Sequence, residues 1–230
     1  LNEAGCALVG GHTGEGSELA LGFAVNGLID AQLAGAMTKG GLRPGDALIL
    51  TKPIGTGTLF AAHARPRMGV VCRGRWIDAA LESMQLSNRD AARCLREHGA
   101  TACTDLTGFG LLGHLVEMTR PSAVDAELDL KALPLLEGAA DMAAAGILSS
   151  LQPANVRLRR ALRNQEEALS HPNYPLLFDP QTAGGLLAGV PADRAEACLA
   201  ELRRLGYVHA ARIGRVLPQG KAPEPISLVV

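Results

Sequence analysis

The sequence has few aromatic residues and few cysteines. Phe, Trp and Tyr make up 3% of the 230 residues, and the five cysteines include no C-x-x-C pair. An odd number of widely spaced cysteines argues against a disulfide framework and a zinc site, and it favours a reducing compartment, the cytoplasm. We therefore interpret the cysteines as small apolar core residues. They are Cys6, Cys72, Cys94, Cys103 and Cys198.

The sequence also lacks an excess of charge and a long apolar run. Its 22 basic and 23 acidic residues give a formal net charge of -1, so no bulk charge attracts nucleic acids or anionic membranes. Apolar runs such as 47–50 and 185–190 are far shorter than the roughly 20 residues that span a bilayer. Residues 1–9 begin with leucine and show no signal-peptide pattern. We therefore expect no membrane span, and a chain that begins within a longer protein.

The hydropathy pattern predicts a folded α/β (α+β) protein, because 47% of the residues are hydrophobic and apolar segments with strand and helix periods alternate. Turn formers at 39–46 predict a boundary near residue 38, which gives regions 1–37 and 38–217 and a flexible tail at 218–230. Strands are expected at 6–9, 19–25, 47–51, 101–107, 126–130, 175–179, 185–190 and 209–216. Helices are expected at 55–64, 76–98 (one or a pair), 108–120, 139–147 and 193–205.

The glycine-rich segment 10–16 is a candidate anion site. Gly10 and Gly11 let backbone N–H groups approach a phosphate closely, and His12 adds a donor. A tight hairpin that merely tolerates glycine explains the segment equally well. The P-loop pattern G-x-x-x-x-G-K-[ST] is absent from the sequence.

Asp105 is the best candidate for a metal ligand. It lies between a predicted strand and a predicted helix, where a carboxylate can hold Mg²⁺ beside phosphate oxygens. The alternative is an N-cap or Asx turn that starts the helix.

Three further features keep alternatives open. Gly108, Gly110 and Gly113 match G-x-G-x-x-G, the pattern of a dinucleotide site, but polar residues crowd the turn before them and disfavour that reading. Segment 178–187 is either a substrate-side loop or an ordinary turn. Lys52 is either a phosphate contact or a solvated strand end.

Five ordered segments resemble selenophosphate synthetase (selenide, water dikinase), of the aminoimidazole ribonucleotide synthetase superfamily. They are LVGGHT at 8–13, KGGLRPGDALILTKPIGTG at 39–57, TDLTGFGLLGHL at 104–115, SLQPAN at 150–155 and DPQTAGGLL at 179–187.

The resemblance implies a fold, cofactors and a reaction. Region 38–217 would be the carboxy-terminal synthetase-like domain, with mixed sheet and helices, and 1–37 a remnant of the amino-terminal ATP-binding and dimerisation domain. Gly10, Gly11 and His12 match the nucleotide-binding segment, and Asp105 matches the magnesium-binding aspartate. The implied phosphotransferase makes selenophosphate, AMP and phosphate from ATP, selenide and water, for selenocysteine and selenouridine synthesis, as a homodimer when full length.

The sequence departs from the family at one point. Family members begin with a glycine-rich segment that carries a catalytic Cys or selenocysteine and a nearby Lys, and neither Cys6 nor Lys52 has that context. We assign no catalytic residue and expect this chain alone to be inactive or nearly so. The alternatives are another ATP-using superfamily member, such as thiamine monophosphate kinase, and a noncatalytic packing or dimerisation domain fused to a flavin-dependent oxidoreductase.

Overall fold

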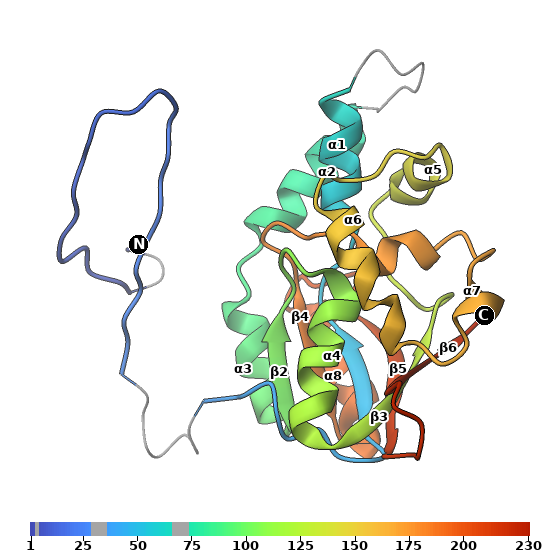
Figure 1. Cartoon of the computed structure of the whole chain (residues 1–230). Coiled ribbons are helices and arrows are strands. Elements are labelled where there is room, and N and C mark those ends of the chain that lie inside the picture. The colour runs from blue at the N-terminus through green and yellow to red at the C-terminus, as the bar shows by residue number, and fades with distance from the viewer. Residues whose placement is uncertain (3–4, 29–35, 66–73) are drawn as a thin grey trace. The chain divides into compact units, whose positions relative to one another are not determined.

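The chain divides into two units, Leu1–Ala36 and Met37–Val230. The computed structural model describes residues 1–2, 5–28, 36–65 and 74–230. Within the described part of the first unit no residue lies in a helix or strand (Figure 1). Large apolar side chains there, such as Leu19 and Val25, are exposed. The predicted strands at 6–9 and 19–25 are therefore wrong. A two-stranded hairpin is marginal by itself, because it has nothing against which to bury its apolar face.

The second unit is built around a six-stranded mixed sheet. The strand order is β2-β4-β1-β5-β3-β6, and only the β3–β6 pair is parallel. The other four pairs are antiparallel, so β4 runs between β2 and β1 in the opposite direction. The strands are β1 (Ala47–Leu50), β2 (Ala102–Asp105), β3 (Val124–Asp129), β4 (Leu186–Val190), β5 (Ala211–Pro218) and β6 (Ile226–Val229).

The central strand β1 is covered by helices on both sides. Its side chains alternate between two hydrophobic clusters: Leu48 and Leu50 belong to one, and Ala47 and Ile49 to the other. A strand that is buried on both faces is apolar at every position. We call the face of Leu48 the first face of the sheet and that of Ile49 the second face. Each fully buried Leu or Ile contributes about 1.5–3 kcal/mol to folding.

The helices are divided unequally between the two faces. Helices α1, α2, α4 and α5 contribute to the cluster on the first face, and α3 and α8 contribute to that on the second; Figure 1 shows α4 and α8 across the sheet from each other. No helix in the described segments is long and apolar enough to cross a membrane. The helices are α1 (Thr56–His63), α2 (Gly74–Gln85), α3 (Arg89–Glu97), α4 (Gly110–Ser122), α5 (Ala139–Ala144), α6 (Gln152–Asn155), α7 (Gln165–Ala168), α8 (Ala192–Arg204), and the 3-10 helices η2 (Val156–Ala161) and η3 (Tyr174–Phe178).

Two further predictions about local structure are wrong. The predicted strand at 175–179 is the 3-10 helix η3, because a short apolar run does not distinguish a strand from a buried helical turn. The predicted flexible tail at 218–230 ends in the strand β6, whose Ile226 and Leu228 are buried against the sheet. Proline and glycine dominate only 218–225, whereas Ile226–Val229 has the alternation of an edge strand.

Candidate functional site

Four segments singled out in the sequence meet at one end of the sheet, where β1 and β2 end and β4 begins. The Thr51 N–H donates to the Leu186 carbonyl at 3.0 Å, and the Leu106 N–H donates to the Gly185 carbonyl at 2.9 Å. The start of β4 is thus fixed between the ends of its two neighbours. Antiparallel pairing therefore places 52–58, 104–110 and 179–187 side by side, although they are far apart in the sequence.

Gln181 ties the loop before β4 to the start of α1. Its Oε1 accepts hydrogen bonds from the Gly55 N–H at 3.0 Å, from the Thr56 N–H at 3.2 Å and from the Thr56 hydroxyl at 3.1 Å. Backbone N–H groups at the start of a helix have no partner within the helix, so a side-chain acceptor satisfies them. Gln181 is buried, and its Nε2 donates to the backbone and side chain of Asp179.

The Asp179 carboxyl is fully buried beneath this loop. It accepts hydrogen bonds from the Thr58 hydroxyl at 2.8 Å and from Gln181 Nε2 at 3.0 Å. Burial raises the pKa of Asp179 to about 6, and these hydrogen bonds oppose a larger rise. The carboxyl is a structural group, since it faces protein donors rather than solvent.

The loop that follows Asp105 is fixed by three side-chain and backbone contacts. The Thr107 N–H donates to His114 Nε2 at 3.0 Å, and its carbonyl accepts from the Gln181 N–H at 3.0 Å. Asn155 Nδ2 donates to the Gly108 carbonyl at 2.7 Å, which brings in the segment 150–155. A loop fixed in this way presents the adjacent carboxylate in one position.

His114 is neutral and holds the loop as an acceptor. Because Nε2 accepts from Thr107, the ring proton lies on Nδ1, which is 3.3 Å from Glu117 Oε2. Glu117 in turn accepts from Lys39 Nζ at 2.6 Å. Burial lowers the pKa of His114, although Glu117 opposes the shift. The neutral ring can therefore keep its bond to Thr107 at neutral pH.

Asp105 itself is exposed at the end of β2, with its backbone paired to Leu186. Its carboxylate makes no hydrogen bond or ion pair with the residues that the structure describes. Helix α4 begins at Gly110 and has Phe109 at its N-cap, so the interpretation of Asp105 as an N-cap is wrong. An exposed carboxylate without a partner on a fixed loop fits Mg²⁺, which takes one or two carboxylates and keeps several waters.

A cleft adjoins these segments and is lined by all four of them. It has a volume of about 450 Å³ and lies between α1, Gly108, the turn before α6 and the loop before β4. We call it the motif cleft. It is lined by Thr56, Gly57, Phe60, Ala61, Ala64, Arg65, Gly108, Ser149, Ser150, Leu151, Pro180, Gln181 and Thr182.

Lys52 is buried rather than solvated. Its Nζ donates to the Leu86 carbonyl at 2.5 Å and to the Ala183 carbonyl at 3.2 Å, and burial lowers its pKa. The interpretation as a solvated strand end is therefore wrong. A second cleft of about 500 Å³ lies beside it, lined in part by Glu82, Glu137 and His209. Lys52 joins the end of β1 to the loop before β4.

Two of the three glycines of the G-x-G-x-x-G pattern, Gly110 and Gly113, serve packing, whereas Gly108 lines the motif cleft. Gly110 has φ of 69°, and a Cβ there would lie 2.9 Å from the carbonyl carbon of Phe178. A Cβ on Gly113 would lie 2.7 Å from Cβ of Phe109. Helix α4 therefore lies too close to η3 for larger residues, and the pattern does not indicate a dinucleotide site.

The other predicted site residues belong to the first unit. Gly10, Gly11 and His12 are exposed there, in a segment without helix or strand. Sequence reasoning missed His114, Asn155 and Gln181 as the residues that fix the site. They lie within the segments recognised as motifs, but only the fold shows which partners they contact.

Comparisons with known proteins agree with this architecture. The family model of AIR synthase related protein, C-terminal domain, matches residues 43–223. Selenide, water dikinases from Geobacter metallireducens and Pelobacter propionicus are 41% and 38% identical over 95% and 100% of this chain. The protein of that name from Caldanaerobacter subterraneus is 36% identical over 94%. The chain spans 61 to 63% of the length of these relatives.

Solved structures with the same fold include two proteins of other names. The hydrogenase maturation protein HypE superposes with a TM-score of 0.58 at 24% identity, over 87% of this chain and 53% of that one. Thiamine-monophosphate kinase from Stenotrophomonas maltophilia gives 0.53 at 17% identity, over 84% and 52%. At these identities the likeness shows the fold, and it confirms the predicted fold class.

Proposed function

The chain belongs to the family of AIR synthase related proteins, and on this premise we propose that it forms part of a selenide, water dikinase. The observation that carries the proposal is an identity of 36 to 41% to proteins of that name over nearly the whole chain. In the proposed reaction ATP, selenide and water give selenophosphate, AMP and phosphate. The relatives' shared name favours this reaction over that of another superfamily member.

We assign the metal-binding role to Asp105. Bound Mg²⁺ would neutralise charge that develops on the triphosphate during phosphoryl transfer. The protein contributes a carboxylate whose loop is fixed by His114, Asn155 and Gln181. Fixed groups need no reorganisation as charge develops, so the contribution of this region is electrostatic positioning.

We assign nucleotide contacts to Gly10, Gly11 and His12, whose backbone and ring donors suit phosphate oxygens. The proposal includes a cytoplasmic location, as the widely spaced cysteines predict, and a homodimer for the full-length protein, as the family resemblance implies. Residues 1–230 alone are expected to show little or no synthetase activity, because Asp105 is one carboxylate where the reaction needs several metal ligands.

The test compares AMP release from ATP, with selenide, by the full-length protein that contains this sequence and by its Asp105→Asn variant. Loss of a metal-binding charge is expected to lower turnover about 10-fold or more at limiting Mg²⁺, with partial recovery at high Mg²⁺. Asp78→Asn removes an exposed carboxylate from α2 and is the matched control. Turnover in Asp105→Asn equal to that of Asp78→Asn at every Mg²⁺ concentration would remove Asp105 from the metal site. Selenide-independent turnover in the unmodified protein would contradict the dikinase itself.

A further inference from the structure

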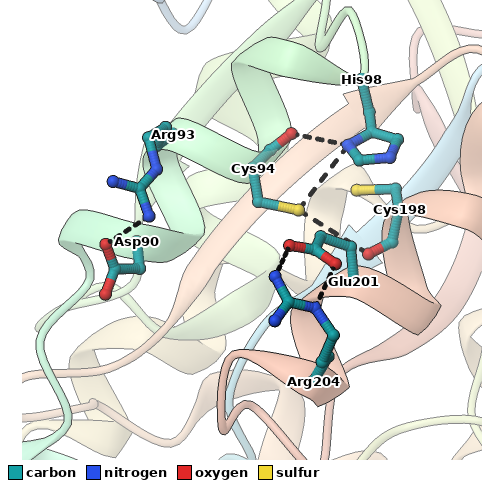
Figure 2. A network of polar contacts seen from close by, with 7 residues as sticks. All are labelled: Asp90, Arg93, Cys94, His98, Cys198, Glu201 and Arg204. Carbon is teal, nitrogen blue, oxygen red and sulfur yellow. Dashed lines mark hydrogen bonds and ion pairs between the residues drawn. The ribbon is translucent and has the colours of Figure 1, made fainter.

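Helices α3 and α8 bring together three side chains that bind soft metal ions. Cys94 and His98 are four residues apart and share one face of α3, and Cys198 faces them from α8 (Figure 2). One ligand atom from each residue can be chosen so that all three lie within 4.8 Å of one another. Cys94 and Cys198 are buried in the hydrophobic cluster on the second face, whereas His98 is partly exposed.

The separations are near those of a tetrahedral site. With Zn–S of about 2.3 Å and Zn–N of about 2.0 Å, a sulfur and a nitrogen ligand lie about 3.5 Å apart, and two sulfurs about 3.8 Å. The observed distance from Cys94 Sγ to His98 Nδ1 is 3.7 Å. The other separations are at most 4.8 Å, within about 1 Å of those that a tetrahedral site requires.

The Cys94 sulfur is only weakly engaged by the groups around it. Its Sγ contacts the Cys198 carbonyl at 3.8 Å and His98 Nδ1 at 3.7 Å, while His98 Nδ1 makes an ordinary hydrogen bond of 2.9 Å to the Cys94 carbonyl. The nearby Glu201 carboxylate is held by two hydrogen bonds from Arg204, at 2.8 and 2.6 Å. Figure 2 shows Asp90 paired with Arg93 in the same region. The carboxylates of Asp90 and Glu201 therefore already have cationic partners, and the thiols do not.

We propose that Cys94, Cys198 and His98 bind one Zn²⁺ ion, with water in the fourth position. Two thiolates and an imidazole select a borderline or soft ion over Mg²⁺ or Ca²⁺, which require oxygen ligands. Zn²⁺ accepts a tetrahedral S₂N set with an open position. The partly exposed His98 leaves a route from solvent to the buried sulfurs. The inference does not depend on the proposed dikinase function.

Binding of Zn²⁺ must release protons from the two cysteine thiols. Burial raises the pKa of the Cys94 thiol and raises that of Cys198 to about 12, so both are protonated in the metal-free protein. Each Zn²⁺ replaces the two thiol protons, and two thiolates balance its charge. His98 changes from a donor toward the Cys94 carbonyl to a neutral ligand with its proton on the other ring nitrogen. The affinity should therefore increase with pH.

The wide spacing of the cysteines along the chain argues against a zinc site. Cys94 and Cys198 are 104 residues apart, and the packing of α3 on α8 removes that separation. Zinc at this position would hold α3 and α8 together on the second face. The helices that flank the motif cleft lie on the opposite face of the sheet. Because the site lies away from the motif cleft, its affinity for Zn²⁺ should not depend on ATP or selenide.

The test is a titration of the reduced chain with Zn²⁺ against a chromophoric chelator, together with Co²⁺ absorption spectra. We expect one equivalent per chain and sulfur-to-cobalt charge-transfer bands with the intense visible bands of tetrahedral Co²⁺. Cys94→Ser and Cys198→Ser should abolish the bands, and His98→Gln should weaken Zn²⁺ binding at least about 10-fold. His98→Gln keeps both core sulfurs, so it tests the site even where a cysteine variant fails to fold.

Three cysteine variants outside the cluster are matched controls. Cys103→Ser removes a buried thiol from β2, and Cys6→Ser and Cys72→Ser remove the remaining thiols; all three should keep one equivalent of Zn²⁺. The proposal is overturned if the reduced chain binds no Zn²⁺, if His98→Gln binds as tightly as the unmodified chain, or if binding is lost with a control cysteine instead. It is also overturned if the only reaction of the cluster is a Cys94–Cys198 disulfide formed on oxidation.

Discussion

The two faces of the sheet are built from different chemistry. On the first face, a buried polar network of Gln181, Asp179 and Thr58 connects the start of α1 to the loop before β4, beside the exposed Asp105. On the second face, α3 and α8 pack through apolar residues that include Leu95 and Leu199. Among the described residues, the one group of possible metal ligands there is the Cys94–His98–Cys198 cluster. The first face thus orders loops for a ligand at the sheet end, while the second holds two helices against the sheet.

This difference predicts that equal losses of stability on the two faces have unequal effects on the site. Gln181→Ala leaves three donors at the start of α1 without their acceptor, and we expect a loss of about 3 kcal/mol in the free energy of unfolding. Leu199→Ala opens a cavity on the second face and should cost about the same. Urea denaturation measures both losses.

Turnover of the full-length protein then separates the two variants. Below their unfolding transitions, Gln181→Ala should lose activity because the start of α1, beside the motif cleft, loses its side-chain acceptor, whereas folded Leu199→Ala should retain it. The proposed difference between the two faces is wrong if both variants lose activity in proportion to their loss of stability. In that case the polar network would contribute to folding only.

The buried Asp179 carboxyl should have a smaller effect, which is to make the free energy of unfolding depend on pH. Its pKa is about 6 in the folded chain and about 3.8 without the fold, so between these values the folded state holds a proton that the unfolded state has lost. Stability from this group is therefore full below pH 3.8 and is lost as the pH rises toward and through 6. A shift of about two units corresponds to about 3 kcal/mol at most.

Asp179→Asn provides the comparison, because the amide does not titrate. Urea denaturation at a series of pH values should show the unmodified chain losing about 2 kcal/mol relative to the variant between pH 4 and pH 7. A constant difference across that range would show that the buried carboxyl titrates normally.

Much of the second unit was predictable from local sequence patterns. The strands around 47–50 and 186–190 and helix α8 follow from apolar runs and helical periodicity, and the structure confirms them. Segment 175–179 was not predictable, because an apolar run of five residues fits a strand and a 3-10 turn equally. The β6 strand was missed because the Pro- and Gly-rich residues before it masked a short alternating segment.

The candidate site was predictable only in part. Asp105 could be identified because strand, carboxylate and helix start are consecutive in the sequence. The support from Gln181 and Asn155 could not, since it depends on hydrogen bonds to backbone atoms more than 40 residues away. The Cys94–His98–Cys198 cluster could not be predicted from the sequence, because its two cysteines come from helices that are adjacent only in the folded chain. Gly10, Gly11 and His12 stay a prediction.

We propose that Asp105 holds the divalent ion at the end of the sheet where β1 and β2 end and β4 begins. Mn²⁺ replaces Mg²⁺ at oxygen-ligand sites and can be counted by electron paramagnetic resonance. The full-length protein with ATP should bind Mn²⁺, and Asp105→Asn should weaken that binding about 10-fold or more, while Asp78→Asn leaves it unchanged. Equal Mn²⁺ affinity in the two variants would show that Asp105 is not a ligand of the divalent ion.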